Sequence, residues 1–482
     1  MKILFVSAEV APFAKVGGLA DVAGSLPKAL HALGHDVRVL MPSYKLVEDE
    51  PQWKLKRKIE SFEVQINSNW TKAAYLNEAT MDGVPVYLVG TDEWFNKSTS
   101  SETIYLPGCD AYLFLASAAV QVPGLLDWKP DVVHANDWHT GFIPVLMRER
   151  MRQGWDDVAA TFTIHNLAYQ GDFGFDVLDK LGLPHYLFNL DQLEFYGSIN
   201  FLKAGCVFAD QVNTVSPRYA DEIQTPAFGF QLDGLMMHLA RQRRLSGILN
   251  GIDDRIFNPS TDPHIAARFD ADNPGGKALC KAALLERLDM EPIDGAPLLG
   301  VVSRLSDQKG MNLILDGADE IFKMPCQLVV QGLGDEWLTA AFEALEKKYP
   351  NHFRFVHAFD VALAQQIYAG CDGFLMPSMF EPCGLGQMIA MRYGTLPTVR
   401  STGGLADTVH EGTNGFTFAE KTTDAFVDAV RRAHSTYGVP EAWKALDQAA
   451  MRGDYSWSRS AQAYIALYEK ALSQRRSVAK SA

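Results

Sequence analysis

The chain has 482 residues, of which 47% are hydrophobic and 21% are charged, a composition typical of a folded globular protein and unlike that of a disordered one. Because a single hydrophobic core stops growing at roughly 250–300 residues, we expect two or three domains. The 44 Lys and Arg residues are outnumbered by 58 Asp and Glu residues, and the net charge of −14 argues against binding to a nucleic-acid backbone.

The six cysteines and the N-terminus indicate the compartment. The cysteines are scattered without a C-x-x-C pair, which disfavours a disulfide framework or a zinc ribbon and fits a reducing environment. The N-terminus runs from Met1-Lys2 into a short apolar segment at 3–6, which is too short for a secretory signal. No apolar stretch reaches the roughly 18 residues of a membrane-spanning helix. We therefore expect a cytoplasmic protein with no membrane partner.

Short apolar runs alternate with helical patterns along the whole chain. In the first half, the pattern predicts helices at 18–33 and 111–122 and strands at 3–7, 37–41, 84–89, 132–134, 161–164 and 211–215. In the second half, it predicts strands at 298–303, 327–331, 353–356, 373–377 and 395–399. Apolar strands between amphipathic helices predict βαβ units and parallel sheets in both halves.

A break in this pattern separates the two halves. Residues 249–263, LNGIDDRIFNPSTDP, interrupt the periodicity with Asn, Gly, Asp and Pro. We therefore expect one Rossmann-like domain at 1–248, a second at 249–455, and a C-terminal helix at 456–482. The residues on one face of that helix are apolar or aromatic: Trp457, Ala461, Tyr464, Leu467, Tyr468 and Ala471. The helix either ends the second domain or returns to the first.

The segment GGLAD occurs twice, at 17–21 and at 403–407, each time after a predicted strand and at the start of a helix. The two copies are either unrelated helix N-termini or two glycine loops that face the same anion. Ligands of open α/β sheets bind outside the carboxyl ends of the strands, so two facing domains would bring both loops to one cleft.

Cationic residues accompany these strand ends. Lys15 precedes the paired glycines Gly17 and Gly18, whose backbone can approach a phosphate closely. Arg304 and Lys309 stand at opposite ends of a loop after a strongly apolar strand, where an Arg fork and a Lys charge can meet phosphate oxygens. The alternatives are a tight turn with a solvated lysine and a surface loop of ion pairs.

Carboxylates and aromatic residues stand at further strand ends. Glu381 precedes a glycine-rich turn and a helix, where it can accept sugar hydroxyls or simply stabilise the helix N-terminus. HANDWHTG at 134–141 and the IHN segment at 164–166 place His, Asp and Trp residues together, which suits a sugar. A catalytic metal is disfavoured because HExxH is absent. Together these segments predict a cleft for a sugar attached to a diphosphate.

The segments KVGGLADV, HANDWH, IHN, LNGID, SRLSDQKG, EPCGLGQ and STGGLADTV resemble those of the bacterial glycogen synthases and plant starch synthases, collinearly from Lys2 to about Tyr468. The resemblance implies a GT-B fold, in which two Rossmann-like, doubly wound α/β domains face each other across a deep cleft. It also implies transfer of glucose from ADP-glucose to the non-reducing end of an α-1,4-glucan, with retention and without a metal or other cofactor.

The resemblance implies a diphosphate site. Its cations would be Lys15, Arg304 and Lys309. Its backbone cradle would be shaped by four glycines: Gly17, Gly18, Gly403 and Gly404. Helix amides would come from Leu385 and Gly386, and Gly386 stands where the family often has a threonine.

The resemblance also implies the residues around the sugar and the base. Glu381 would orient the donor glucose through its hydroxyls, and His165 and Asn250 would contact the same sugar. Asp137 would lie beside the sugar and the acceptor. Phe359 falls where the family places an aromatic ring against adenine.

Two other readings compete with an ADP-glucose-dependent synthase, and a third is disfavoured. A transferase that uses UDP-glucose or another acceptor is not separated by sequence, because Phe359 would stack on either base. An inactive glucan-binding scaffold predicts decay of the charged residues, whereas Lys15, Arg304, Lys309 and Glu381 are all present. A dehydrogenase is disfavoured because no G-x-G-x-x-G fingerprint follows a strand. For the transferase we favour a front-face mechanism in which the departing phosphate helps to take the acceptor proton.

Overall fold

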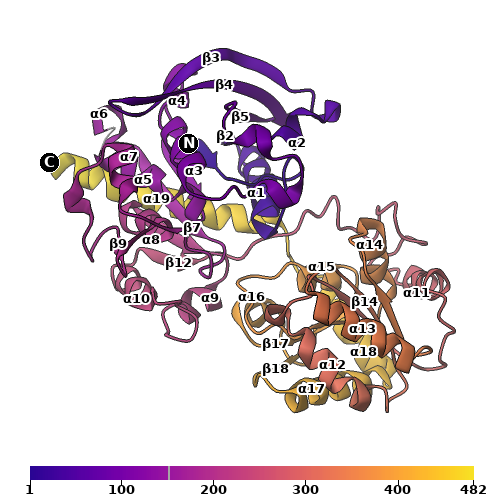
Figure 1. Ribbon diagram of the computed structural model, residues 1–482. Helices are drawn as coiled ribbons and strands as arrows, with labels where there is room; N and C mark the ends of the chain where they lie inside the picture. The colour runs from indigo at the N-terminus through magenta and orange to yellow at the C-terminus, as the bar shows by residue number, and fades with distance from the viewer. Residues whose placement is uncertain (150–151, 482) are drawn as a thin grey trace. The chain divides into compact units, whose positions relative to one another are not determined.

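The computed structural model, which describes residues 1–149 and 152–481, divides into two compact units (Figure 1). The first unit comprises Met1–Val215, Ala220–Asn250 and Trp457–Ala482. The second comprises Ser216–Tyr219 and Gly251–Ser456. The helix α9 (Pro217–Glu222) contains the point, between Tyr219 and Ala220, at which the chain returns from the second unit to the first.

The first unit is an α/β unit with one large sheet and one small one. The strands of the large sheet are β1 (Lys2–Val6), β2 (Asp36–Pro42), β3 (Lys56–Asn67), β4 (Trp70–Met81), β5 (Val84–Gly90), β6 (Val132–Asn136), β7 (Ala159–Ile164), β11 (Gln211–Thr214) and β12 (Leu245–Gly247). The small sheet contains β8 (Asp172–Phe173), β9 (Glu194–Phe195) and β10 (Ser198–Asn200). The helices of this unit are α1 (Gly18–Ala32), α2 (Lys45–Glu48), α3 (Asp110–Ala119), α4 (Val122–Leu125), α5 (Phe142–Glu149), α6 (Arg152–Trp155), α7 (Asp176–Leu181), α8 (Phe201–Phe208), α10 (Asp233–Arg241) and α19 (Trp457–Ser481). Short 3₁₀ helices are η1 (Pro51–Trp53), η2 (Phe95–Lys97), η3 (Ser101–Thr103), η4 (Trp138–Thr140) and η5 (His185–Leu187).

The strand order of the large sheet, β12-β11-β7-β6-β1-β2-β5-β4-β3, is that of a doubly wound fold. The chain winds from β1 through β2 to β5 on one side and from β6 through β7 to β11 on the other, with parallel pairing throughout. The topological switch point therefore lies between β1 and β6. Side chains that follow these two strands meet at the edge where such folds bind ligands.

The antiparallel strands β3 and β4 are an addition to the predicted parallel strands. They form a long hairpin beside β5, with register shifts between the paired residues. The first residues of β3 are mostly charged, and one face of the strand is exposed, so the hairpin lacks the continuous apolar run that marks a buried parallel strand. The six strands predicted in this half are confirmed, with ends that shift by at most two residues.

The second unit is a parallel sheet with helices. Its strands are β13 (Leu298–Val302), β14 (Gln327–Gln331), β15 (Phe353–Val356), β16 (Gly373–Met376), β17 (Leu396–Arg400) and β18 (Phe416–Phe418). Its helices are α11 (Gly276–Arg287), α12 (Met311–Ile321), α13 (Glu336–Lys348), α14 (Val361–Gly370), α15 (Gly386–Arg392), α16 (Gly403–Thr408), α17 (Thr423–Tyr437) and α18 (Pro440–Met451), with the 3₁₀ helix η6 (Asp307–Lys309) before α12. The order β15-β14-β13-β16-β17-β18 places a second switch point between β13 and β16.

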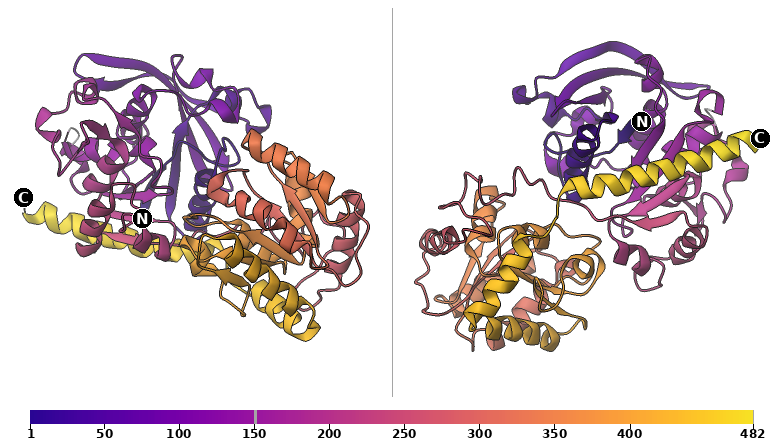
Figure 2. Two further views of the ribbon diagram at one scale, coloured as in Figure 1. Left: turned by 60° about the horizontal axis from the view of Figure 1, so that its bottom comes forward. Right: turned by 180° about the vertical axis from the view of Figure 1, so that it is seen from behind.

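The C-terminal helix α19 packs on the first unit, against α1, β7 and β11 (Figure 2, right). All six residues predicted to form its apolar face are buried. Two tyrosine hydroxyls also contact polar groups of the sheet. The Tyr468 hydroxyl lies 2.8 Å from Nδ1 of His134, and the Tyr464 hydroxyl accepts a hydrogen bond from Nδ2 of Asn213 at 3.2 Å. Among the described residues, no helix has the length and apolar character needed to cross a bilayer.

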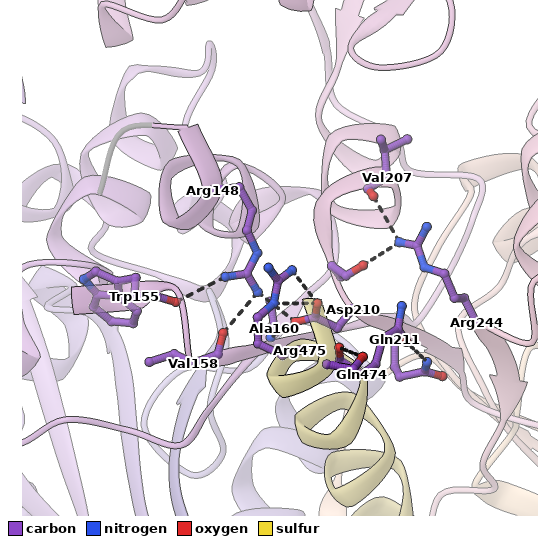
Figure 3. A network of polar contacts seen from close by, with 12 residues as sticks. Arg148, Trp155, Val158, Ala160, Val207, Asp210, Gln211, Arg244, Gln474 and Arg475 are labelled. Atoms are coloured by element: carbon purple, nitrogen blue, oxygen red, sulfur yellow. Dashed lines mark hydrogen bonds and ion pairs between the residues drawn. The ribbon is translucent and has the colours of Figure 1, made fainter. Parts of the chain in front are cut away.

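A buried carboxylate fixes the far end of α19 (Figure 3). Asp210, only 3% exposed, accepts hydrogen bonds from Arg475 Nε of α19 at 2.9 Å and from Arg148 of α5 at 2.7 Å. It also accepts the backbone N–H of Ala160 at 2.8 Å. Arg244 lies nearby and donates to the carbonyl of Val207 at 3.0 Å. One carboxylate therefore joins a helix, a strand and the C-terminal segment.

Candidate active site

The loop after β1 folds around the buried carboxylate of Glu9. Its Oε2 accepts the backbone N–H groups of Val16 at 2.6 Å and Gly17 at 2.9 Å. Burial raises the pKa of Glu9, and the two amide donors act in the opposite direction. Lys15, in the same loop, pairs with Asp21 of α1 at 2.6 Å. The amide of Gly17, which the sequence suggested for a phosphate, is therefore bound to a side chain of its own unit.

Asp137 links the ends of β6 and β7. It follows β6 with a positive φ of +56°, a conformation that costs a non-glycine residue free energy and is concentrated at functional sites. Its Oδ1 accepts the backbone N–H of His165 at 2.7 Å, and its carboxylate also accepts that of Asn166. Burial raises the pKa of Asp137 to about 7 despite these two donors. The carboxylate thus holds the loop that contains His165.

His165 lies directly after β7 with its ring against β6. Its Nε2 is 2.9 Å from Oδ1 of Asn136, the last residue of β6. Burial lowers the pKa of His165 to about 3, so the ring is neutral near pH 7. Asn250, at the end of the first unit, is also buried, and its Oδ1 has no hydrogen-bond partner among the described residues.

The other histidines of HANDWHTG have different surroundings. His134 lies inside the sheet, where its Nε2 is 2.6 Å from Thr163 Oγ1, and burial lowers its pKa to about 3. His139 packs against the ring of Tyr105, with the ring centroids 4.7 Å apart. These two residues support the strand end structurally. Trp138 packs edge-on against Tyr112 and closes the aromatic cluster.

In the second unit, the loops after β13 and β16 meet through an ion pair. Lys309 Nζ is 2.6 Å from Glu381 Oε2, and the side chains are 18% and 8% exposed. Ser378 donates its hydroxyl to the same oxygen at 3.0 Å. Gly310, with φ +67°, lets the Lys309 loop approach, because a Cβ there would lie 2.0 Å from the carbonyl oxygen of Pro377. Arg304 is exposed, and its side chain has no hydrogen-bond partner in the described part of the chain.

The second GGLAD segment supports the Glu381 loop from behind. Gly403 has φ +45°, and a Cβ there would lie 2.0 Å from the carbonyl oxygen of Glu381. A Cβ at Gly404 would lie 2.2 Å from that of Cys383, and the amide of Gly404 donates to the carbonyl of Glu381 at 3.2 Å. The two glycines are thus required by close packing of one backbone segment on another.

The remaining predicted residues of this unit lie at or just before the starts of two helices. Leu385 and Gly386 begin the short helix α15 directly after the Glu381 turn. The Phe359 side chain, before α14, is 76% exposed, so its ring face is available to a flat group. No group of three or more His, Cys, Asp or Glu side chains that could hold a metal ion occurs within 1–149 and 152–481.

Comparison with known proteins places this chain in a family. Residues 2–238 match the family model described as a starch synthase catalytic domain, and residues 289–450 match that of the group 1 glycosyl transferases. A glycogen synthase of Thermotoga maritima is 44% identical, and one of Syntrophotalea carbinolica is 41% identical; each alignment covers 98% of this chain and 99% of the relative. The chain belongs to the glycogen and starch synthase family.

Solved structures agree with this assignment. The catalytic domain of starch synthase IV from Arabidopsis thaliana, bound to ADP and acarbose, superposes with a TM-score of 0.89 at 32% identity. The match covers 98% of this chain and 99% of that one. Sucrose-phosphate synthase of Thermosynechococcus elongatus, at 16% identity and a TM-score of 0.60, shares the fold. This synthase has the GT-B fold and is a retaining glycosyltransferase.

Three residues of the site lay outside the sequence prediction: Glu9, Asn136 and Ser378. Glu9 is a charged residue three positions after the strongly apolar strand β1, and this position is a signal in the sequence that could have marked it. Asn136 lies within the segment HANDWHTG. Ser378 had no signal, since its contact with Glu381 depends on the turn after β16.

Gly403→Ala is expected to lower kcat/KM about tenfold and to destabilise the second unit by about 1–3 kcal/mol. The added Cβ meets the carbonyl of Glu381, so the turn that carries this carboxylate must move. Gly438→Ala is a matched control, because φ there is −64° and the nearest atom to a Cβ is 3.4 Å away. Steady-state kinetics and thermal unfolding check both variants; equal behaviour would show that the close approach at Gly403 is unimportant.

Proposed function

We propose that this synthase transfers glucose from ADP-glucose to the non-reducing end of an α-1,4-glucan, with retention of configuration. The observation that carries the proposal is the Lys309–Glu381 ion pair at the β13/β16 switch point of a chain from this family. It holds a cation and a carboxylate together at the edge where a doubly wound sheet binds its ligand. The ADP bound to the related starch synthase supports the choice of donor.

The diphosphate is bound by cations and backbone amides. Arg304 donates two hydrogen bonds to phosphate oxygens. Its guanidinium is available for this because it forms no hydrogen bond or ion pair with another described residue. Lys309 adds a second charge from the same loop of the second unit. The amides of Leu385 and Gly386, at the start of α15, complete the anion site. These cations stabilise the charge that develops on the leaving group, the task that a metal performs in other transferases.

The second set of residues places the sugar and the base. Glu381 orients the donor glucose by accepting hydrogen bonds from its hydroxyls. Lys309, the ion-pair partner of Glu381, binds the phosphate. In the first unit, we assign His165 and Asn250 to the binding of a sugar, and Asp137 holds the loop that contains His165. The exposed ring of Phe359 stacks on adenine.

Transfer then follows a front-face course. The bond from the anomeric carbon to the diphosphate oxygen breaks as positive charge builds on the sugar ring. The acceptor hydroxyl attacks from the same side, and its proton passes to the departing phosphate. Glu381 acts as an orienting group in this course, so no covalent glucosyl–enzyme bond forms.

The six cysteines are unpaired and buried, which supports a reducing, cytoplasmic location for this chemistry. Transfer of radiolabel from ADP-glucose to glycogen tests the proposal, with UDP-glucose as the matched alternative donor because Phe359 can stack on either base. Label in glycogen from ADP-glucose supports it. Preferential labelling from UDP-glucose would show that UDP-glucose, and not ADP-glucose, is the donor. No labelling from either donor would contradict the proposed activity and favour an inactive glucan-binding scaffold.

A further inference from the structure

The side-chain amide of Asn136 is held in one orientation. Asn136 is fully buried at the end of β6, and its Nδ2 donates to the carbonyl of Val6 in β1 at 3.0 Å and to that of His134 at 3.4 Å. The reversed amide would bring its oxygen against these two carbonyl oxygens, which cannot donate. The Oδ1 atom must therefore face away from β1, toward β7.

This orientation determines which nitrogen of His165 carries the proton. Nε2 of His165 lies 2.9 Å from Oδ1 of Asn136, and an amide oxygen only accepts hydrogen bonds. Nε2 is therefore the donor. Because the buried ring is neutral, Nδ1 carries a lone pair. No residue in the described part of the chain forms a hydrogen bond with Nδ1, so this acceptor remains available to a ligand.

We propose that Asn136 is a positioning residue that fixes His165 as the Nε2–H tautomer, so that Nδ1 accepts a hydroxyl of the donor sugar. Asp137 holds the backbone of His165 at 2.7 Å, and Asn136 holds its ring. The last residue of β6 and the residue after it thus determine both the position and the protonated nitrogen of His165. The ligand part of this proposal rests on the proposed function, whereas the tautomer does not.

Nitrogen NMR of the full-length protein labelled at histidine tests the tautomer directly, with the His165 signals assigned by their loss in His165→Ala. We expect wild type to show a protonated Nε2 and a bare Nδ1, and Asn136→Ala to show a mixture of tautomers. Asn213→Ala is the control, because it removes a fully buried amide of the same sheet that does not touch His165. A pure Nε2–H form in Asn136→Ala, or a protonated Nδ1 in wild type, would overturn the proposal.

Kinetics separate positioning from a general packing defect. We expect Asn136→Ala to lower kcat/KM for ADP-glucose about tenfold in the wild-type background and to have no further effect in His165→Ala. Additive losses in the two backgrounds would contradict the proposal. If Asn136→Ala does not fold, Asn136→Leu, of similar volume and without polar atoms, serves the same two measurements. A tautomer change in an enzyme without ADP-glucose transfer would refute the proposed function alone.

Discussion

Arg304→Ala and Lys309→Ala are each expected to lower kcat at saturating ADP-glucose by a hundredfold or more. Each removes a cation that we assign to the leaving diphosphate, and the loss of one donor to developing charge costs about 2.7–4 kcal/mol in comparable sites. Saturating donor separates this loss from weaker binding, because an interaction made only in the transition state appears in kcat.

The two variants differ in their effect on folding. Arg304 is exposed and without an internal partner, so its removal should leave the thermal unfolding temperature unchanged. Removal of Lys309 leaves the buried Glu381 carboxylate with Ser378 as its remaining side-chain partner among the described residues, and should lower that temperature. Lys323→Ala, which removes a lysine with a 68% exposed side chain from the same unit, is the control for loss of one positive charge. Wild-type kcat in Arg304→Ala would exclude this residue from the leaving-group site.

Asp210→Asn is expected to destabilise the first unit by about 3–5 kcal/mol, because it leaves two buried guanidinium groups without their counter-ion. Asp210 is 3% exposed, and the Arg148 and Arg475 side chains that it pairs with are 11% and 16% exposed (Figure 3). The effect should be strongest in α19, which Arg475 ties to the sheet. Hydrogen exchange along α19 and urea unfolding measure the two consequences.

An exposed ion pair gives the matched control for that variant. Asp319 pairs with Lys348 on the surface of the second unit, with side chains 61% and 56% exposed. Exposed pairs contribute about 0–1 kcal/mol, so Asp319→Asn should change the free energy of unfolding by less than 1 kcal/mol. If Asp210→Asn were as mild as Asp319→Asn, or if α19 kept its protection from exchange, the carboxylate would not hold the helix in place.

The parallel parts of the fold could be predicted from sequence because their strands are continuous apolar runs. β1 and β13 are buried along nearly their whole length and stand out without any tertiary information. The β3–β4 hairpin could not be predicted in this way, because its exposed face is polar and its pairing depends on β5. Predictions from apolar runs therefore find the strands that carry the site and miss the edge of the sheet.

The candidate site divides along a similar line. The glycine, Lys and Glu segments could be found from their positions after strands, but the 2.6 Å contact between Lys309 and Glu381 joins residues 72 positions apart and needed the fold. The repeated GGLAD segment was only partly informative. A Cβ at Gly17 would meet no atom within 4 Å, whereas one at Gly403 would meet a carbonyl oxygen at 2.0 Å. The same five-residue sequence thus begins at an open position in the first unit and at a closely packed position in the second.

The stereochemistry of transfer tests the central claim most directly. The synthase would be incubated with ADP-glucose labelled with carbon-13 at the anomeric carbon and with a malto-oligosaccharide acceptor, and the product followed by NMR. The account predicts that the label appears in a new α-1,4 linkage at the non-reducing end while ADP is released. Label in a β-linkage, or label only in free glucose, would contradict it.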